Sequence, residues 1–108
     1  MTQRRGEIVL IRMQFHQAAG AKVRPAVILL DTGDDDFVAA PITSAAQRSE
    51  FDVPVEDWRQ AGLNVPSTIR VHKLSVLPKP EILRSIGRLT ERDGAALLAA
   101  LRNAFDLE

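Results

Sequence analysis

The 108-residue sequence contains no cysteine, no long apolar run and no net charge. Without cysteine the chain cannot form disulfide bonds, and it cannot use a thiolate as a nucleophile or a zinc ligand. No apolar run approaches the ~20 residues that a membrane-spanning helix needs, and no apolar segment of secretory length follows the first residues. We therefore expect a cytoplasmic protein of a single domain, residues 1–108, that does not contact a membrane.

The neutral balance of charge argues against a protein that coats nucleic acid non-specifically. The charges are nevertheless unevenly distributed. Residues 1–24 carry five basic residues and one acid, residues 25–69 two basic and eight acidic residues, and residues 70–108 seven basic and five acidic residues. If the two ends of the chain meet in the fold, they form a basic surface that attracts a polyanion. The alternative is ordinary charge in contact with solvent.

The segment Ala26–Leu30 is an unbroken apolar run, and its β-branched residues favour a strand that is buried on both faces. Arg24 stands at the entrance of this strand and is held extended because it precedes Pro25. A permanent cation at the mouth of a stiff strand is a candidate site residue. The alternative is an arginine whose head group lies in water.

A second strand is predicted for Glu7–Phe15 from its alternating apolar residues, and the segment His16–Lys22 reads as a loop. After the buried strand, the Gly- and Asp-rich residues 31–36 predict a turn, and a third strand then returns from Phe37 toward Thr43 and Ser44. Because a hairpin of this length places the end of one strand beside the start of the other, we expect both hydroxyl residues near the cation of residue 24.

The second half of the chain predicts short strands and a terminal helix. Pro54 places the strand around residues 51–55 at a sheet edge. A single strand is predicted over Ser67–Leu74, and its period of two places Thr68, Arg70 and His72 on one face. Thr90 is a suitable N-cap for a final helix, and we expect one apolar packing stripe on it that runs from Leu97 to Phe105.

Several segments, in this order, together resemble the MazF/PemK (Kid-like) family of toxin endoribonucleases. No single motif among them is very specific, but the ordered set covers nearly the whole chain. The segments are Gly6-Glu7-Ile8-Val9, Arg24-Pro25 before an apolar strand, Ala40-Pro41-Ile42-Thr43-Ser44, Val53-Pro54-Val55 before Trp58 and Gly62-Leu63, Ser67-Thr68-Ile69-Arg70, and Ile86-Gly87-Arg88-Leu89 before the last helix.

The resemblance implies a mainly β fold with helices, namely an SH3-like small β-barrel of the CcdB/Kid/MazF type with a C-terminal α-helix. It also implies a homodimeric toxin of a type II toxin–antitoxin system that is neutralised by a cognate antitoxin. Such toxins are sequence-selective endoribonucleases that inhibit translation and growth. They cleave single-stranded RNA, such as mRNA, without metal or cofactor, by attack of a 2′-hydroxyl that leaves a 2′,3′-cyclic phosphate.

On the family pattern, Arg24 falls on the arginine that stabilises the transition state, and Thr43 falls on the hydroxyl residue that binds phosphate. Arg70 falls on an arginine that Kid-like members use as an acid or a phosphate ligand. Arginine suits phosphate because its planar donors grip two oxygens and its charge is permanent. We also expect four residues to contact RNA: His16, Lys22, Ser44 and Lys73.

Two positions depart from the family pattern, and both remove a carboxylate. Many members carry a glutamate in the loop before the arginine, where this chain offers Lys22, and Kid-like members carry an aspartate where this chain has His72. Either His72 is now the catalytic base, or the nuclease is weakened and His72 only packs. A non-enzymatic binding protein therefore remains an alternative, because the related CcdB poisons gyrase by contact alone.

Overall fold

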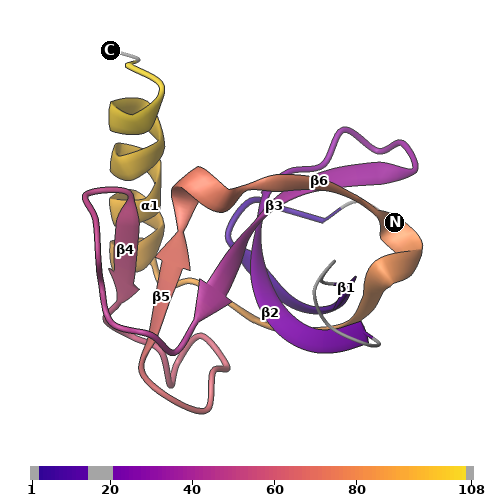
Figure 1. Ribbon diagram of the computed structural model, residues 1–108, viewed down its shortest axis with the longest axis horizontal. Coiled ribbons are helices and arrows are strands. Elements are labelled where there is room, and N and C mark those ends of the chain that lie inside the picture. Colours follow the sequence, from indigo (N-terminus) through magenta and orange to yellow (C-terminus); the bar gives the residue numbers. More distant parts are fainter. Residues whose placement is uncertain (1–2, 15–20, 107–108) are drawn as a thin grey trace.

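The computed structural model describes residues 3–14 and 21–106 (Figure 1). These residues form a seven-stranded antiparallel sheet, two short 3-10 helices and one α-helix. The elements in chain order are β1 (Glu7–Gln14), β2 (Ala21–Leu30), β3 (Asp36–Thr43), β4 (Asp52–Val55), β5 (Ser67–Arg70), η1 (Val71–Lys73), β6 (Ser75–Pro78), η2 (Lys79–Glu81), β7 (Ile82–Arg88) and α1 (Glu91–Ala104).

Strand β3 is the centre of the sheet because it pairs with three other strands. Its first half lies between β2 and β6, and its last residues, Ile42 and Thr43, pair with β5. The strand order is β4-β5-β3-β2-β1-β7, so the exposed Pro54 does lie on an edge strand, as predicted. Figure 1 shows the sheet curling round on itself, with α1 against β4 at one end. Among the described residues β4 and β7 are not paired, so the barrel is open at that seam.

Both faces of the curled sheet are buried, as the apolar run in β2 predicted. In β1, Ile8 packs into one core, and Val9 and Ile11 pack into the other. The first core extends to α1 through Leu97, which is 1% exposed, and the second is closed by Phe37. Strand β1 also pairs with β7, so the basic N-terminal and C-terminal parts of the chain do lie side by side.

The turn after β4 is fixed to the N-terminus of α1 by buried polar groups. Thr90 caps the helix, as predicted, by accepting a hydrogen bond from the Asp93 amide at 3.4 Å. The carboxylate of Asp93, only 1% exposed, accepts hydrogen bonds from the amides of Glu56 and Asp57 at 3.0 and 2.8 Å. Asp57 in turn binds Arg92, and this pair, with the Thr90 hydroxyl, lowers the pKa of Asp57. The helix is thereby docked through its first turn.

The open seam is sealed by two glycines, Gly62 and Gly87. Gly62 has φ +92°, which an L side chain rarely adopts, and its Cα faces the backbone of Ile86 and Gly87. A Cβ on Gly87 would overlap the carbonyl oxygen of Ala61. The turn over residues 56–62 therefore reaches β7 backbone to backbone, and Trp58 of this turn packs onto the first core.

The structure corrects several predicted boundaries. Lys22 belongs to β2 and not to a loop, because β1 and β2 stay paired as far as Gln14 and Ala21. The strand predicted over residues 67–74 ends at Arg70, and the chain turns into η1, so His72 does not continue its face. Strand β6 was not predicted, since Pro78, its last residue, and Pro80 indicate a break in the chain. Phe105, assigned to the packed stripe of the helix, is 57% exposed.

Within the described residues no helix combines the length and apolar character needed to cross a membrane.

The glycine contact at the seam predicts that Gly87→Ala destabilises the fold. The added methyl group must displace the Ala61 carbonyl, and overpacking of this kind costs about 1–3 kcal/mol. Gly94→Ala is the matched control, because a Cβ at this helical position meets nothing within 4 Å. It should stabilise the helix by about 1 kcal/mol. Urea denaturation of both variants measures the free energy of unfolding. A parent-like value for Gly87→Ala would contradict the prediction, because it would show that the backbone at the seam moves to make room for the methyl group.

A buried carboxylate, Asp31, links the start of the chain to the turn after β2 and to η2. It accepts hydrogen bonds from the amides of Gln3 and Gly33 at 2.7 and 2.8 Å, and it pairs with Lys79 at 2.9 Å. The Gln3 amide and the Lys79 ammonium lower the pKa of Asp31 from its usual 3.8 to about 2. Since the folded pKa is the lower one, the ionised group stabilises the fold above about pH 3.8, and this contribution disappears as the pH falls toward 2.

Asp31→Asn should therefore lower the melting temperature at pH 7, and the deficit should shrink as the pH falls through the interval between 3.8 and about 2. Asp35→Asn in the same turn is the control, because the side chain of Asp35 is exposed and its substitution removes the same charge. Thermal unfolding of the parent and both variants at several pH values checks this. A deficit that does not change with pH would contradict the assignment.

Candidate functional site

A pocket of about 340 Å³ opens where β2 begins and β3 ends. Antiparallel pairing of β2 with β3 brings these two strand ends together, since Ala26 lies opposite Pro41. The pocket therefore contains the cation from one strand and the hydroxyls from the other, Arg24 with Thr43 and Ser44, as the hairpin argument predicted.

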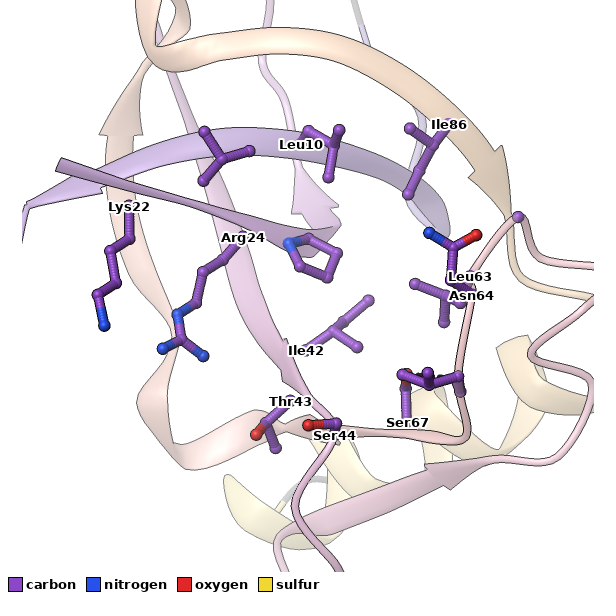
Figure 2. Close-up of a pocket in the computed structure, with 14 residues that line it drawn as sticks. Leu10, Lys22, Arg24, Ile42, Thr43, Ser44, Leu63, Asn64, Ser67 and Ile86 are labelled. Atoms are coloured by element: carbon purple, nitrogen blue, oxygen red, sulfur yellow. Dashed lines mark hydrogen bonds between the residues drawn. The ribbon is translucent and has the colours of Figure 1, made fainter.

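The cations of the pocket come from the first half of β2. Lys22 and Arg24 are two residues apart, so they lie on the same side of the strand. Figure 2 shows both side chains running in the same direction, with the guanidinium of Arg24 toward Thr43 and Ser44. The main chain is stiff here because Pro25 follows Arg24, and Arg24 lies opposite the buried Ile11 of β1. Two positive charges are thus presented from a rigid strand.

The Thr43 hydroxyl is oriented by the chain that follows it. Its Oγ1 accepts a hydrogen bond from the Ala45 amide at 3.1 Å, which satisfies the turn and leaves the hydroxyl proton available as a donor. Ser44 beside it is exposed. The end of β3 can therefore offer hydroxyl donors to an anion that Arg24 holds.

The remaining wall of the pocket is mostly apolar and was not predicted. It is contributed by β1, β7 and the loop between β4 and β5, and Figure 2 shows Leu10, Ile86, Leu63 and Asn64 on the side away from Lys22. The loop residues reach the pocket because Gly62 brings the loop against β7. The resulting pocket joins an anion-binding side to an apolar side, with Asn64 as a hydrogen-bonding group.

The other proposed site residues, Arg70, His72 and Lys73, do not line this pocket. They form a second cluster at the end of β5 and in η1. Arg70 lies directly opposite Asp52 in the pairing of β4 with β5, and its Nε is 3.6 Å from Asp52 Oδ1. His72 Nδ1 is 4.0 Å from the same oxygen. The sequence pattern did not indicate this carboxylate, because Asp52 alternates with apolar residues like any polar residue of an edge strand.

Of the second cluster, Arg70 lies on the strand next to Thr43 and on the same face of the sheet, whereas His72 and Lys73 follow in η1. Thr43 pairs with Thr68, and Arg70 stands two residues further along β5. Because side chains alternate, Arg70 shares the face of Thr68, at about 7 Å along the strand. That spacing is within the reach of an extended arginine side chain. His16 lies outside the described residues, so its expected contact with RNA stays a prediction.

Residues 4–105 match the family described as PemK-like, MazF-like toxin of type II toxin–antitoxin system. The chain belongs to this family. Two curated relatives, the endoribonucleases MazF3 of Mycobacterium tuberculosis strains CDC 1551 / Oshkosh and ATCC 25618 / H37Rv, are each 33% identical over 98 residues, covering 87% of this chain and 93% of the relative.

Solved structures of MazF toxins share the fold. The Mycobacterium tuberculosis toxin MazF-mt6 superposes with a TM-score of 0.74 at 30% identity, over 93% of this chain and 98% of that one. A MazE–MazF crystal structure from Deinococcus radiodurans gives a TM-score of 0.77 at 19% identity over 98% of each chain. The expected fold class, a small barrel-like β-sheet with a C-terminal helix, is therefore confirmed for this MazF-like toxin.

The sequence pattern did not predict a carboxylate beside Arg70 and His72. Asp52 supplies one from the neighbouring strand. Only the register of β4 with β5 reveals it, because Asp52 and Arg70 are 18 positions apart in the sequence.

Proposed function

We propose that this MazF-like toxin is a sequence-selective endoribonuclease that cleaves single-stranded RNA by phosphoryl transfer to the adjacent 2′-hydroxyl. The observation that carries the proposal is the pocket in which Lys22, Arg24 and Thr43 converge opposite an apolar wall. The cations and the hydroxyl suit a phosphodiester, and the apolar wall with Asn64 suits an unstacked base. The names of the curated MazF3 relatives support the same activity.

Arg24 is proposed to stabilise the transition state, and Thr43 to donate a hydrogen bond to a phosphate oxygen. Attack of O2′ on phosphorus places extra negative charge on the non-bridging oxygens, and a preformed guanidinium beside them lowers the barrier. Lys22 and Ser44, on the same side of the pocket, are proposed to hold the phosphodiester in register. Lys73 is exposed in η1 and is proposed to bind a neighbouring phosphate.

His72 is proposed as the general base and Arg70 as a phosphate ligand. The imidazole takes the proton from the 2′-hydroxyl, the O2′–P bond forms, the P–O5′ bond breaks, and the leaving oxygen takes a proton from water. The products are a 2′,3′-cyclic phosphate and a 5′-hydroxyl. The side chain of His72 is 33% exposed, so substrate can reach it. No metal or cofactor takes part in this scheme, because a cation and a base complete it.

The proposed partners are RNA, a cognate antitoxin and a second copy of the chain. The solved relatives include a mycobacterial endoribonuclease in complex with its cognate antitoxin. Apolar side chains on the surface of this chain suit such contacts, and Val23 and Val65 stand at the candidate pocket itself. We place the activity in the cytoplasm, where mRNA is translated and its cleavage inhibits growth.

Replacement of Arg24 tests the proposed chemistry. Arg24→Ala should reduce cleavage of a long single-stranded RNA, assayed with chelator present, by about 10²–10³-fold while the melting temperature changes little. Arg24→Lys should recover part of the rate, since it restores charge but not the planar pair of donors. Arg59→Ala is the matched control, because this arginine lies over Trp58, outside the pocket. Parent-like cleavage by Arg24→Ala would refute the assignment and favour a non-enzymatic binding protein.

A two-fold dimer is the expected assembly in solution. A chain of 108 residues buries a modest core, and large apolar side chains such as Leu30 and Val76 are 54% and 67% exposed. Light scattering at micromolar concentration should report twice the mass of one chain. A monomer that cleaves RNA at the full rate would contradict the need for a dimer.

A further inference from the structure

The carboxylate of Asp52 is buried and only half satisfied. Its side chain is 2% exposed, and its Oδ2 accepts hydrogen bonds from the amides of Arg48 and Ser49 at 2.8 and 3.2 Å. Its Oδ1 accepts no hydrogen bond from the described residues, and the facing Nε of Arg70 is likewise buried without one. An oxygen left in this state costs free energy, so a purely structural aspartate would be expected to have both oxygens paired.

The unpaired oxygen faces two donors that stand just beyond hydrogen-bond distance, Arg70 Nε at 3.6 Å and His72 Nδ1 at 4.0 Å. Contacts with Phe51 hold the imidazole of His72 in this position. Its ring lies 5.8 Å from the ring of Phe51, and the preceding amide, that of Val71, donates to the Phe51 carbonyl at 3.0 Å. Catalytic hydrogen bonds are often long in free enzymes and shorten when substrate binds.

We infer that Asp52 is a positioning residue for RNA cleavage, whose Oδ1 accepts the Nδ1 proton of His72 and the Nε proton of Arg70. This inference rests on the proposed function of His72 and Arg70. When Nδ1 carries the proton, the lone pair of the neutral imidazole lies on Nε2, where it can take the proton of the 2′-hydroxyl. The same carboxylate orients Arg70 through Nε and leaves its two terminal nitrogens for a phosphate.

The chemistry of an aspartate beside a histidine makes this role distinct from packing. The negative charge stabilises the imidazolium that forms when Nε2 accepts a proton, so it helps the transition state more than the ground state. A residue that only held the turn over residues 48–52 would need Oδ2 alone.

Asp52→Asn separates the role of Asp52 in holding the turn over residues 48–52 from its role in positioning His72. The amides of Arg48 and Ser49 are donors, so the carboxamide must place its oxygen toward them and its NH₂ at the position of Oδ1. The turn is then preserved, but a donor now faces His72 Nδ1, which must lose its proton to Nε2. We expect a folded protein in which cleavage falls by about 10²-fold, within the range of general-base contributions.

Asp57→Asn is the control, since it removes a carboxylate that pairs with an arginine, Arg92 at 2.6 Å, beyond the other end of β4. It should lower stability without changing the cleavage rate. In the background of His72→Asn, Asp52→Asn should cost less than about 3-fold more, because both substitutions remove the same base. The inference would be overturned if the double variant lost the product of the two single-variant rate losses, or if Asp52→Asn cleaved at the parent rate.

The tautomer of His72 gives a readout that does not depend on activity. ¹⁵N NMR of the labelled parent, in the pH range where the imidazole is neutral, should show a proton on Nδ1, and Asp52→Asn should move it to Nε2. A parent with its proton on Nε2 would refute the role of Asp52 even if RNA is cleaved. Conversely, an Nδ1 proton in a parent that fails to cleave RNA would confirm the contact and reject the proposed function. The parent measurement stands even if Asp52→Asn does not fold.

Discussion

The hydrogen bonds of β3 are the constraint on which the rest of the molecule depends. This strand is paired along both edges, with β2 and β6 in its first half and with β5 at its end. Buried amide and carbonyl groups must be paired, so the chain on either side has to supply strands of matching length and register. The curl of the sheet and the meeting of β2 with the end of β3 both follow from this requirement. The candidate pocket lies at that meeting point.

Closure of the fold relies on contacts between backbones and on buried carboxylates more than on side-chain volume. Gly62 and Gly87 let the chain after β4 touch β7 where no side chain fits. Asp93 ties the same turn to α1, and Asp31 ties the start of the chain to η2. Each of these carboxylates satisfies backbone amides that would otherwise be unpaired, which a hydrophobic residue could not do.

Asp52 differs from these two carboxylates in one respect that bears on function. Asp93 and Asp31 have hydrogen-bond donors at both oxygens, while Asp52 has them at one only. The unused oxygen faces Arg70 and His72, which we propose as a phosphate ligand and as the general base. An unsatisfied buried polar atom beside these groups supports the positioning role inferred for Asp52. Asp52, Arg70 and His72 come from three adjacent elements, β4, β5 and η1.

The sequence by itself determined the buried strand of β2, the capped helix and the pairing of Arg24 with the hydroxyls at the end of β3, because these depend on local pattern and on one hairpin. It also determined the family, through an ordered set of segments. The tertiary structure decided the rest. The end of β5 at Arg70, the strand β6 that ends at Pro78 and the seam at Gly62 depend on partners distant in sequence. So does the place of Asp52, because a strand pattern tells which residues alternate but not which residue of another strand each will face.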